Sequence, residues 1–533
     1  MLESLSQLFW KEEHIDPTGG SKIQFTSLKR WVGLVGVVLF TFCAIFFRFI
    51  SLKADPDWRL DWSTGLFTDE AYYFTNARNL VLFGQTRLDE FNNMVLSPLL
   101  HLVQVGLFRL FGVSYEPVRA MTAVCGLLAA VFLGLAFNRV MGKRAGWLAF
   151  LFLAFDHAFL LYNRIALIET PIAMVLCLAV YVWAISQKAK RQVIPLVLAG
   201  ALVAIAVTTK FSAAVILPGF LLALLCMKGH KYRPLLWLGL GFIVVFAIWH
   251  FAWSQPNHTE ITRMVHHYRY VQLQPHSMAD LLRNINLGLF GQYKGWAHFH
   301  IIHQSVLFAL CLFGFFMLLN WKNKLGENDG IGLLMAGWLL GGWLLMSVIN
   351  YSPTRYYVVY LPAIAGFSAW VLLRASSWWQ RDDDKKFPRL AFLAPTAILL
   401  FLLINIGWLT NWYTHRTYQM ETATKWMQDN MKEGDVVVGD CAPPLCAETQ
   451  IQSFLVSPGL CNWPHPIERF NATYVTMLGD GVQAEEWWRR GYPDLIQPAN
   501  VAHIFQFGKY KVSLYKIPPQ GPGRNRTEQA WPL

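Results

Sequence analysis

Two adjacent carboxylates stand in the stretch Thr68-Asp69-Glu70-Ala71-Tyr72-Tyr73, between the first long hydrophobic segment of the chain and the next. Charged side chains beside a bilayer are costly unless they are neutralised or used, so this pair is a candidate functional site. A third acid begins a later hydrophobic segment, in Asn163-Arg164-Ile165-Ala166-Leu167-Ile168-Glu169-Thr170-Pro171. Working outward from these two motifs, we predict a polytopic helical membrane protein with its chemistry at one membrane face.

Composition supports a membrane protein. Of 533 residues, 55% are hydrophobic and 15% charged, and the mean hydropathy is +0.34. The apolar share exceeds the roughly 45–50% that is usual in soluble domains. A helix needs about 20 apolar residues to cross a hydrocarbon core roughly 30 Å thick. We predict about eleven such spans, near 31–52, 117–138, 145–162, 170–186, 193–209, 211–227, 234–253, 304–321, 331–349, 356–375 and 390–411.

The basic residues between the predicted spans indicate the orientation. If the spans alternate in direction, every strongly basic loop lies on the same side as the N-terminus, which the positive-inside rule identifies as the cytoplasm. This placement accounts for the net charge of +12 without nucleic acid as a partner. The basic loops contain Arg139, Lys143 and Arg144; Lys188, Lys190 and Arg191; Lys228, Lys231 and Arg233; Lys322 and Lys324; and Arg381, Lys385, Lys386 and Arg389.

The same alternation defines the predicted domain organisation. The first 30 residues are polar, without the apolar core of a cleavable signal peptide, so we expect the first span to be retained. An apolar stretch at 97–112 would invert every later loop if it were a span, and we interpret it as a helix at the external interface. The predicted parts are a cytoplasmic segment 1–30, a transmembrane domain 31–411 with external loops 53–116 and 254–303, and an extracytoplasmic α/β domain 412–533. Its expected elements are a helix at 421–430 and buried strands at 436–438 and 502–507.

Each acid has a structural and a chemical interpretation. Thr68 is a good helix N-cap, and acids in a first turn are favoured by the helix dipole, so Asp69 and Glu70 could simply stabilise a helix. Alternatively, one of them is a general base whose proton affinity is raised by its neighbour. Glu169 precedes Pro171, which suits a helix start, so it is either a cap-region acid or part of the site.

Three cations near external span ends also have two interpretations. Arg164 is either an ion-pair partner of Glu169 or a ligand for a phosphate, which its planar fork suits. Lys210 follows the fifth span, and Arg355 precedes the tenth. Snorkelling to the interface would explain both. Because external cations are disfavoured at span ends, their gathering around carboxylates instead indicates a site for an anionic lipid headgroup.

Histidines and cysteines give weaker signals. His266 and His267, or the spacing His298-x-His300-x-x-His303, could bind a metal, but neither matches a strong ligand pattern, and we expect no metal or cofactor, with a divalent cation left open. Outside the spans lie Cys441, Cys446 and Cys461, and an oxidising compartment would permit one disulfide among them. Nucleotide-binding and metalloprotease motifs are absent from the sequence.

Four motifs together resemble the GT-C membrane glycosyltransferases. They are Asp69-Glu70 in the first external loop, Arg164 to Glu169 before the fourth span, Lys210-Phe211-Ser212 after the fifth, and Arg355-Tyr356-Tyr357 before Leu361-Pro362. The closest resemblance is to the protein O-mannosyltransferase and lipid A aminoarabinose transferase group, the family 39-like glycosyltransferases, over about residues 30–410.

The resemblance implies an inverting transferase that moves a hexose or pentose from a polyprenyl-phosphate donor to an acceptor hydroxyl on the external face of the plasma (inner) membrane. The acceptor would be a lipid, glycan or protein. By position, Asp69 is the implied base, and Glu70 supports it or positions the acceptor. Glu169 is the further carboxylate of the implied catalytic site. Arg164, Lys210 and Arg355 would hold the phosphate. Candidate substrate contacts are Tyr72, Tyr73, His266, His267, Arg269 and Tyr356.

The sequence departs from the family pattern in one stretch, and two functions other than a glycosyltransferase are also considered. The stretch Asn93-Met94-Val95-Leu96-Ser97-Pro98 lacks the acidic, lysine or histidine residues found there in aminoarabinose and protein mannosyltransferases, which indicates a different acceptor or phosphate contacts from elsewhere. A transporter or flippase of lipid-linked sugars would place polar residues in mid-span. A non-catalytic membrane subunit would not need both acid motifs. The ionisable residues gather at the external mouth, which favours an enzyme.

Overall fold

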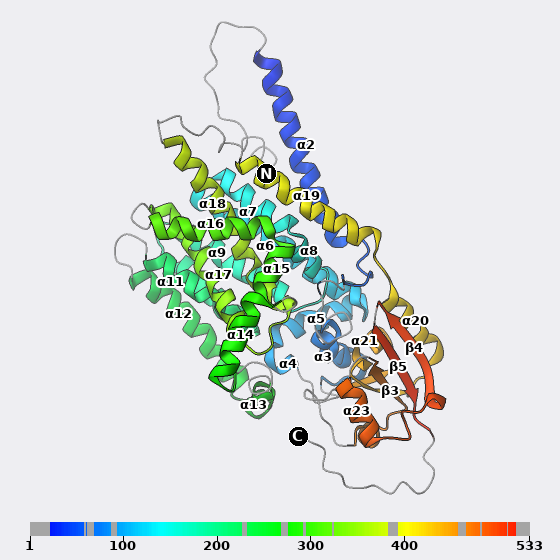
Figure 1. Cartoon of the computed structure of the whole chain (residues 1–533). Coiled ribbons are helices and arrows are strands. Elements are labelled where there is room, and N and C mark those ends of the chain that lie inside the picture. Colours follow the sequence, from blue (N-terminus) through cyan, green and yellow to red (C-terminus); the bar gives the residue numbers. More distant parts are fainter. Residues whose placement is uncertain are drawn as a thin grey trace.

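The computed structural model combines a helical bundle with a small α/β unit at one end (Figure 1). It describes residues 22–57, 60, 69–86, 93–225, 232–267, 275–291, 295–321, 325–381, 393–456, 465–479, 482–508 and 510–518.

The bundle consists of long apolar helices. Each predicted span coincides with one of them or with a consecutive pair: α2 (Lys22–Phe49), α6 (Tyr115–Met141), α7 (Lys143–Phe155) with α8 (His157–Tyr162), α9 (Glu169–Ser186), α10 (Val193–Thr209), η1 (Phe211–Ile216) with α11 (Leu217–Leu225), α12 (Tyr232–Trp249) with η2 (His250–Ser254), α16 (Ser305–Trp321), α17 (Gly330–Val348), α18 (Leu361–Arg381) and α19 (Leu393–Thr414). Within the described residues, five helices are long and apolar enough to cross a membrane unaided. A sixth is added if α15 (Trp296–His303) and α16, bent by 119°, form one span. The helical membrane class is therefore supported, and the count of eleven spans stays a prediction.

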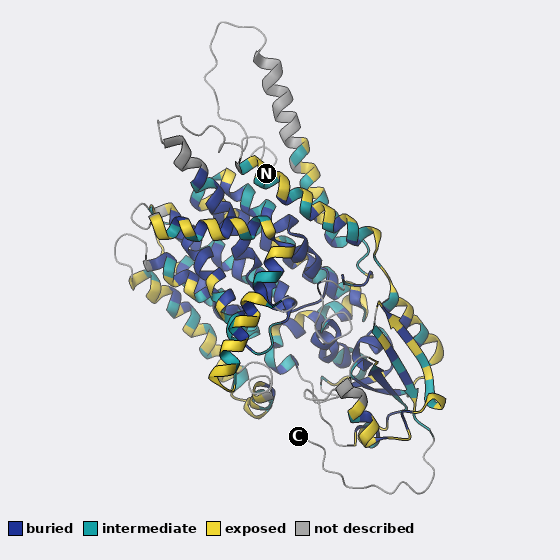
Figure 2. Ribbon diagram, in the orientation of Figure 1, coloured by how far each residue is buried: buried dark blue, intermediate teal, exposed yellow. Residues whose placement is uncertain are grey.

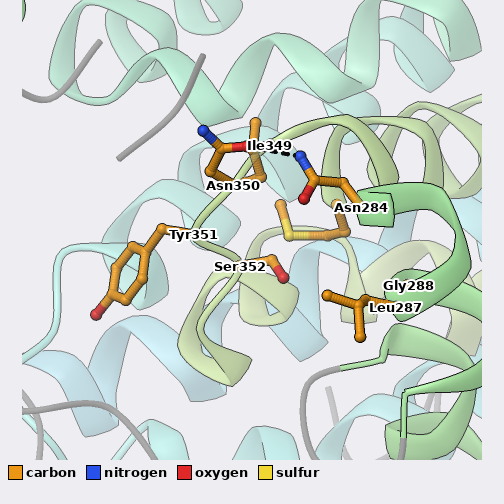
Figure 3. Close-up of a pocket in the computed structure, with 8 residues that line it drawn as sticks. Asn284, Leu287, Gly288, Ile349, Asn350, Tyr351 and Ser352 are labelled. Atoms are coloured by element: carbon orange, nitrogen blue, oxygen red, sulfur yellow. Dashed lines mark hydrogen bonds between the residues drawn. The ribbon is translucent and has the colours of Figure 1, made fainter. Parts of the chain in front are cut away.

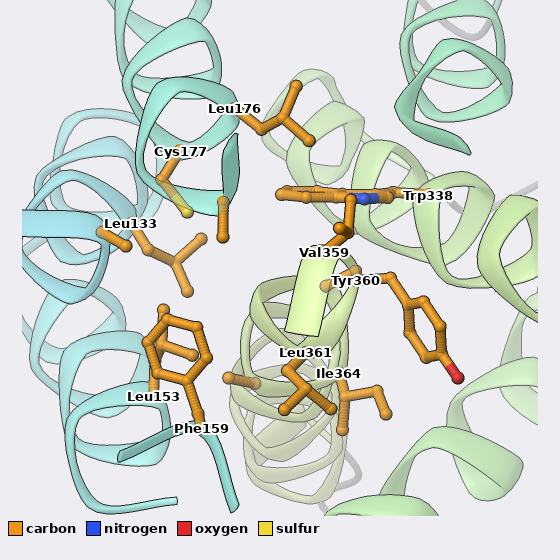
Figure 4. Packing of buried hydrophobic residues seen from close by; sticks show 14 of the residues in the cluster. Leu133, Leu153, Phe159, Leu176, Cys177, Trp338, Val359, Tyr360, Leu361 and Ile364 are labelled. Atoms are coloured by element: carbon orange, nitrogen blue, oxygen red, sulfur yellow. The ribbon is translucent and has the colours of Figure 1, made fainter. Parts of the chain in front are cut away.

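The distribution of apolar side chains separates inner from outer helices. Helices α6, α7, α9, α17 and α18 are largely buried, whereas α2, α12, α16 and α19 show exposed faces in Figure 2. The exposed residues are apolar, for example Leu39, Ile243 and Leu403. Such an outward apolar surface is what lipid contact requires. In Figure 4, Leu176 and Trp338 from separate helices pack within the bundle core.

Two glycines allow close contact between α10 and α12. A Cβ atom on Gly200 would lie 1.9 Å from the carbonyl oxygen of Leu238, and one on Gly241 would lie 1.9 Å from that of Val197. Small residues at helix interfaces let backbones approach in this way, which matters where lipid supplies no hydrophobic drive between helices.

Short helices cover one end of the bundle. They are α3 (Glu70–Phe83), α4 (Asn93–Leu96), α5 (Pro98–Phe111), α13 (His258–His267), α14 (Met278–Phe290) and the 3₁₀ turn η6 (Thr354–Val359). Helix α5 forms where an interfacial helix was predicted, and it packs on α3 through Phe74 and Phe108, whose ring centroids are 5.7 Å apart.

The C-terminal α/β unit comprises residues 419–516. Its elements are α20 (Gln419–Asn430), β1 (Val436–Gly439), α21 (Ala442–Cys446), β2 (Gln452–Leu455), α22 (Pro466–Phe470), β3 (Tyr474–Leu478), α23 (Val482–Gly491), η8 (Pro498–Asn500), β4 (Val501–Phe507) and β5 (Tyr510–Lys516). The sheet order is β2-β1-β3-β5-β4, with β1 parallel to β2 and β3, and β5 antiparallel to β3 and β4. The predicted helix and both predicted strands are present, and β1 is buried as expected. The prediction that 502–507 is buried is wrong, because β4 is an edge strand whose side chains alternate between the core and solvent.

The predicted disulfide is not seen among the described cysteines. Cys441 and Cys446 lie at the two ends of α21, and both are buried free thiols. They pack among apolar side chains, so burial rather than oxidation accounts for them. Cys461 lies outside the described residues.

Arg78 of α3 joins the α/β unit to the bundle. Its side chain is fully buried and donates to the backbone carbonyls of Cys446, Ala447, Thr449 and Ile451. Four charge-assisted hydrogen bonds from one guanidinium hold the unit against α3.

Replacing Arg78 by Met should loosen this attachment, because four buried carbonyls would lose a charged donor and only that of Cys446 is known to keep others, the N–H and hydroxyl of Thr449. Each such loss costs about 1–3 kcal/mol, and we expect the unfolding free energy of the unit to fall by several kcal/mol. Limited proteolysis in lipid should then release the α/β unit early. The control is Arg283→Met, since Arg283 is exposed and pairs only with Asp280 one turn away. Equal proteolysis rates for the two variants would contradict the attachment.

Candidate active site

Two ion pairs meet where the ends of four helical segments converge. Asp69 is the N-cap residue of α3, and Glu169 is the first residue of α9. Lys210 immediately follows α10, and Arg355 lies in η6. Residues from four distant parts of the chain thus form one cluster, as the motifs predicted.

The first pair joins Asp69 to Arg355. The Arg355 Nη2 donates to Asp69 Oδ2 at 2.5 Å and to the Tyr351 hydroxyl at 3.3 Å. The side chain of Arg355 is 3% exposed and that of Asp69 21%. Burial alone would lower the pKa of Arg355, but Asp69 raises it well above its usual value, so the guanidinium stays charged. Arg355 therefore faces inward, and the snorkelling interpretation does not describe it.

The second pair joins Glu169 to Lys210. The Lys210 Nζ donates to Glu169 Oε1 at 2.5 Å and to the Tyr73 hydroxyl at 3.1 Å. It also lies 4.3 Å from the ring centroid of Tyr356, a favourable cation–π distance. Burial opposes the charge on Lys210, whereas Glu169 and Tyr356 raise its pKa above the usual value. Lys210 is thus a charged residue of the site.

Several polar atoms of this cluster have no partner in the described structure. The Arg355 Nε and Nη1 donors are buried and unpaired, and so is Glu169 Oε2. Buried polar groups are almost always satisfied, so unpaired donors of a guanidinium indicate a place for a ligand. The unpaired Nε–H and Nη1–H groups lie on different edges of the guanidinium plane, so each can donate to its own acceptor oxygen.

The turn η6 that presents Arg355 is itself tightly held. The hydroxyls of Tyr162 on α8 and Thr354 lie 2.5 Å apart, and both donate to the carbonyl of Leu60, at 2.5 and 2.6 Å. Arg355 follows Thr354 directly. A polar group fixed in this way is pre-organised for binding.

Glu70 has a different environment from its neighbour Asp69. Its two oxygens accept a bidentate ion pair from Arg119, with both N–O distances 2.7 Å, and Oε1 also accepts from the backbone N–H of Ala166 at 2.8 Å. Arg119 further donates to the carbonyls of Leu52 and Ala54. Glu70 is therefore a buried structural carboxylate, which fits a supporting role and leaves it no free oxygen for an acceptor. By contrast, the side chain of Asp69 makes no capping hydrogen bond.

Arg164 is not where the motif predicted. Its guanidinium donates to the carbonyls of four residues at the C-terminal end of α2, namely Phe47, Arg48, Ile50 and Ser51. It also stacks on the ring of Trp412 at 4.3 Å. The predicted phosphate contact and the predicted pair with Glu169 are both wrong, because the exposed carbonyls of a helix end bind a guanidinium well.

Of the candidate substrate contacts, Tyr73 and Tyr356 lie in the cluster and Tyr72 does not. The Tyr72 hydroxyl donates to the carbonyl of Asp440, so it contacts the α/β unit instead. Successive helical residues point in directions about 100° apart, which separates Tyr72 from Tyr73. His266 is exposed on α13. The side chain of His267 and all of Arg269 lie outside the described residues.

The predicted histidine cluster forms a buried hydrogen-bond network instead of a metal site. Trp343 Nε1–H donates to His300 Nε2, so the proton of that ring lies on Nδ1, which contacts Gln304 Oε1 at 2.7 Å. Gln304 in turn donates to Asp156, and a parallel contact joins His303 to His157. This network bridges the helix breaks at α7–α8 and α15–α16. Among the described residues, no three His, Cys, Asp or Glu side chains are grouped to hold a metal ion.

Two residues of the cluster were missed by sequence reasoning. Arg119 neutralises Glu70, and Tyr351 accepts from Arg355. Arg119 carries the signal that identified Arg355 and Lys210, an external cation near a span end. Tyr351 has no comparable signal, because tyrosines are common at membrane interfaces.

Comparisons with known proteins bear on the fold. A family model described as dolichyl-phosphate-mannose-protein mannosyltransferase matches residues 96–253. No curated protein sequence matches the chain. ArnT from Cupriavidus metallidurans bound to undecaprenyl phosphate superposes with a TM-score of 0.61 at 14% identity, over 90% of this chain and 97% of that one. The Archaeoglobus fulgidus oligosaccharyltransferase with Zn and sulfate gives 0.51 at 15%, over 82% and 67%.

A further structure of the archaeal enzyme, AglB with an inhibitory peptide and a dolichol-phosphate, gives a TM-score of 0.51 at 15% identity, over 84% of this chain and 69% of that one. ArnT and AglB are both GT-C glycosyltransferases. The predicted resemblance to this superfamily is therefore confirmed, and the chain shares its fold. At these identities the structural likeness shows the fold alone.

The buried Glu70–Arg119 pair generates a stability prediction. Removing one partner leaves an uncompensated buried charge, and we expect Glu70→Gln or Arg119→Met to lower the unfolding free energy by about 3–5 kcal/mol. The double variant should lose clearly less than the sum, because neither charge is then left alone. Denaturation in mixed micelles of the four proteins would measure the coupling. Additive losses, or a Glu70→Gln variant of full stability, would contradict the structural role.

Proposed function

We propose that the chain is an inverting glycosyltransferase that moves a hexose or pentose from a polyprenyl-phosphate donor to an acceptor hydroxyl at the external membrane face. The observation that carries this proposal is the pair of cations, Arg355 and Lys210, held by the carboxylates Asp69 and Glu169, with unpaired guanidinium donors beside them. The family match and the shared fold support the same reaction class.

The donor phosphate would bind to Arg355 and Lys210. The unpaired Nη1 of Arg355 can donate to a phosphate oxygen beside the Nη2 that holds Asp69, and Lys210 adds a point charge. As the bond between the anomeric carbon and the phosphate oxygen breaks, negative charge grows on the leaving phosphate. Cations already fixed in place stabilise that charge without reorganising. A phosphate monoester stabilised in this way needs no general acid.

Asp69 would be the general base. The acceptor oxygen attacks the anomeric carbon from the face opposite the phosphate, its proton passes to an Asp69 oxygen, and the electron pair of the broken bond leaves with polyprenyl phosphate. In the free protein one oxygen of Asp69 accepts from Arg355 Nη2, which fixes the carboxylate beside the proposed phosphate site.

The remaining acids would position rather than react. Glu169 orients Lys210 through Oε1, and Glu70 fixes the first turn of α3 and hence Asp69. Tyr73 and Tyr356 pack around Lys210, where they exclude water and can contact the donor.

The partners follow from this assignment. ArnT is described with undecaprenyl phosphate and AglB with a dolichol-phosphate and a peptide, and we infer a related lipid-linked donor for this chain. The acceptor is a lipid, glycan or protein with a free hydroxyl. We place the protein in the plasma (inner) membrane, with a cytoplasmic N-terminus and the α/β unit outside. The basic loops support this orientation.

Replacing Asp69 by Asn should remove the base but keep the shape of the site. We expect release of polyprenyl phosphate from its sugar-loaded form to fall by about 10²–10⁴-fold, the usual contribution of a general base. Binding of the carrier should persist. Purified protein in lipid, given a panel of radiolabelled polyprenyl-phosphate sugars with candidate acceptors, measures both quantities.

The control is Asp280→Asn, an acid whose ion-pair partner within the described part of the chain is Arg283 on its own helix. It should leave turnover unchanged. If the wild type binds the donor but does not release polyprenyl phosphate, a transport role is favoured. If it does not bind the carrier, polyprenyl-phosphate sugar is not its donor.

Arg355→Lys tests the phosphate contact separately. A lysine keeps the charge but has one nitrogen, which cannot donate to Asp69 and to a phosphate oxygen from separate ends of a rigid plane. Affinity for sugar-free polyprenyl phosphate should therefore fall by about 10–100-fold, as expected for a lost charged hydrogen bond of about 1.5–3 kcal/mol. Isothermal titration against carrier in nanodiscs measures this loss. Arg164→Lys provides the comparison, because Arg164 binds helix carbonyls and its replacement should lower thermal stability without changing carrier affinity.

A further inference from the structure

Asp156 is a buried carboxylate of the bundle that the proposed reaction does not use. It stands between α7 and α8, and its side chain is fully enclosed. Three other buried carboxylates, Glu70, Glu169 and Asp329, each form an ion pair with an arginine or a lysine, whereas Asp156 forms none within the described part of the chain. A charged group inside a membrane-spanning bundle is costly, so it is a candidate for a functional role.

Two N–H groups bind Asp156, and they come from two helices. Oδ1 accepts from the backbone N–H of Phe159 at 2.7 Å, which caps the start of α8. Oδ2 accepts from Gln304 Nε2 at 2.6 Å, and Gln304 is the C-cap residue of α15. The carboxylate therefore joins the start of α8 to the end of α15.

The direction of these hydrogen bonds is fixed from α17. The indole of Trp343 can only donate, so its N–H donates to His300 Nε2 at 3.2 Å and the proton of that ring lies on Nδ1. This proton is donated to Gln304 Oε1 at 2.7 Å, which turns the amide N–H toward Asp156. Because both oxygens of Asp156 then face N–H donors, a protonated carboxyl would set an O–H group against an N–H group. The network requires the ionised carboxylate.

The two helices that Asp156 joins also hold the turn η6. Tyr162 is the last residue of α8, and its hydroxyl lies 2.5 Å from that of Thr354. Phe299, in the first turn of α15, packs on Tyr357, with the ring centroids 4.9 Å apart. Arg355 lies between Thr354 and Tyr357 in η6. The place of its guanidinium therefore depends on how α8 and α15 sit together.

A separate contact holds the segment that leads into η6. Asn284 Nδ2 of α14 donates to Asn350 Oδ1 at 2.7 Å, and the side chain of Tyr351 points away from this pair (Figure 3). The Tyr351 hydroxyl accepts from Arg355 Nη2 at 3.3 Å. This contact does not pass through α8 or α15. A change at Asp156 should therefore shift η6 rather than unfold it.

We infer that Asp156 is a positioning residue of the proposed phosphate site. By holding α8 against α15, it keeps the Arg355 guanidinium where Nη2 binds Asp69 and the unpaired Nη1 can meet a phosphate oxygen. The inference rests on the proposed function and adds a residue that acts on donor binding from inside the bundle.

Asp156→Asn tests this role, because the amide sets an NH₂ group against the N–H of Gln304 or of Phe159. In the full-length protein in nanodiscs, at a temperature where the variant stays folded, the Kd of sugar-free polyprenyl phosphate should rise at least about fivefold, part of the loss expected for Arg355→Lys. If Asp156→Asn does not fold, Gln304→Met removes the bond between the helices, keeps the cap of α8 and should raise the Kd in the same way.

A second substitution should restore the network. With Gln304→Glu added to Asp156→Asn, the carboxylate at position 304 accepts from His300 Nδ1 and from the amide at position 156, whose oxygen accepts from the N–H of Phe159. Every donor then faces an acceptor, and the charge has moved by one side chain. The carrier Kd of the folded double variant should return to within about twofold of the wild type. Gln304→Glu alone places two carboxylates together and should not restore it.

Asp329→Asn is the matched control. Asp329 is also a buried carboxylate, which pairs with Arg374 and accepts from Trp370. It precedes α17, so about 28 Å of helix separates it from the segment that leads into η6. Its replacement should lower thermal stability and leave the carrier Kd within about twofold.

A double-mutant cycle shows whether Asp156 acts through Arg355. If it does, Asp156→Asn should change the Kd of the Arg355→Lys variant by less than about twofold. Additive losses, an unchanged carrier Kd in folded Asp156→Asn, or no recovery in the folded double variant would overturn the inference. A wild type that binds no carrier would remove the proposed function itself, which is a different result from equal binding by the wild type and Asp156→Asn.

Discussion

The buried carboxylate of Glu70 connects three segments at the end of the bundle that carries the ion pairs. Through Arg119 it holds the start of α6, through the N–H of Ala166 it holds the segment before α9, and Arg119 extends the contact to the carbonyls of Leu52 and Ala54 after α2. Taking two charges out of water is expensive, and the geometry compensates because every oxygen and most of the guanidinium have partners. The position of α3, and with it the position of Asp69, depends on this arrangement.

The neighbouring acids Asp69 and Glu70 have different roles because they differ in burial and in hydrogen-bond partners. Glu70 has no vacant oxygen, whereas Asp69 is bound only through Oδ2 and retains partial exposure. A helix start permits this division, because consecutive side chains there leave in different directions. The same geometry explains why Tyr73 contacts Lys210 while Tyr72 contacts the α/β unit. One turn of helix thus serves the site and the framework at once.

The sequence allowed the helical class, the ranges of the apolar helices and part of the site to be predicted, since these depend on local patterns. Apolar runs of spanning length require no knowledge of partners, and external cations such as Lys210 and Arg355 are unusual enough to be noticed. The hydrogen-bond and ion-pair partners of individual side chains could be predicted less well from the sequence. Arg164 and Arg119 are both external arginines, yet one binds helix carbonyls and the other a carboxylate, and nothing local distinguishes them. The contacts of Tyr72 and Arg78 join residues more than 360 positions apart, which no short pattern encodes.

The last of these contacts has a consequence for biogenesis. Arg78 is among the early residues of the chain, but the carbonyls that satisfy it, from Cys446 to Ile451, are made some 370 residues later. At translation rates of about 5–20 residues per second, that interval is on the order of 20–70 s. During it, helix α3 lacks its final partners, so this end of the bundle stays open. Assembly is completed only when the C-terminal unit has been made and has docked, and a truncated chain would carry the ion pairs without the support that holds their helix.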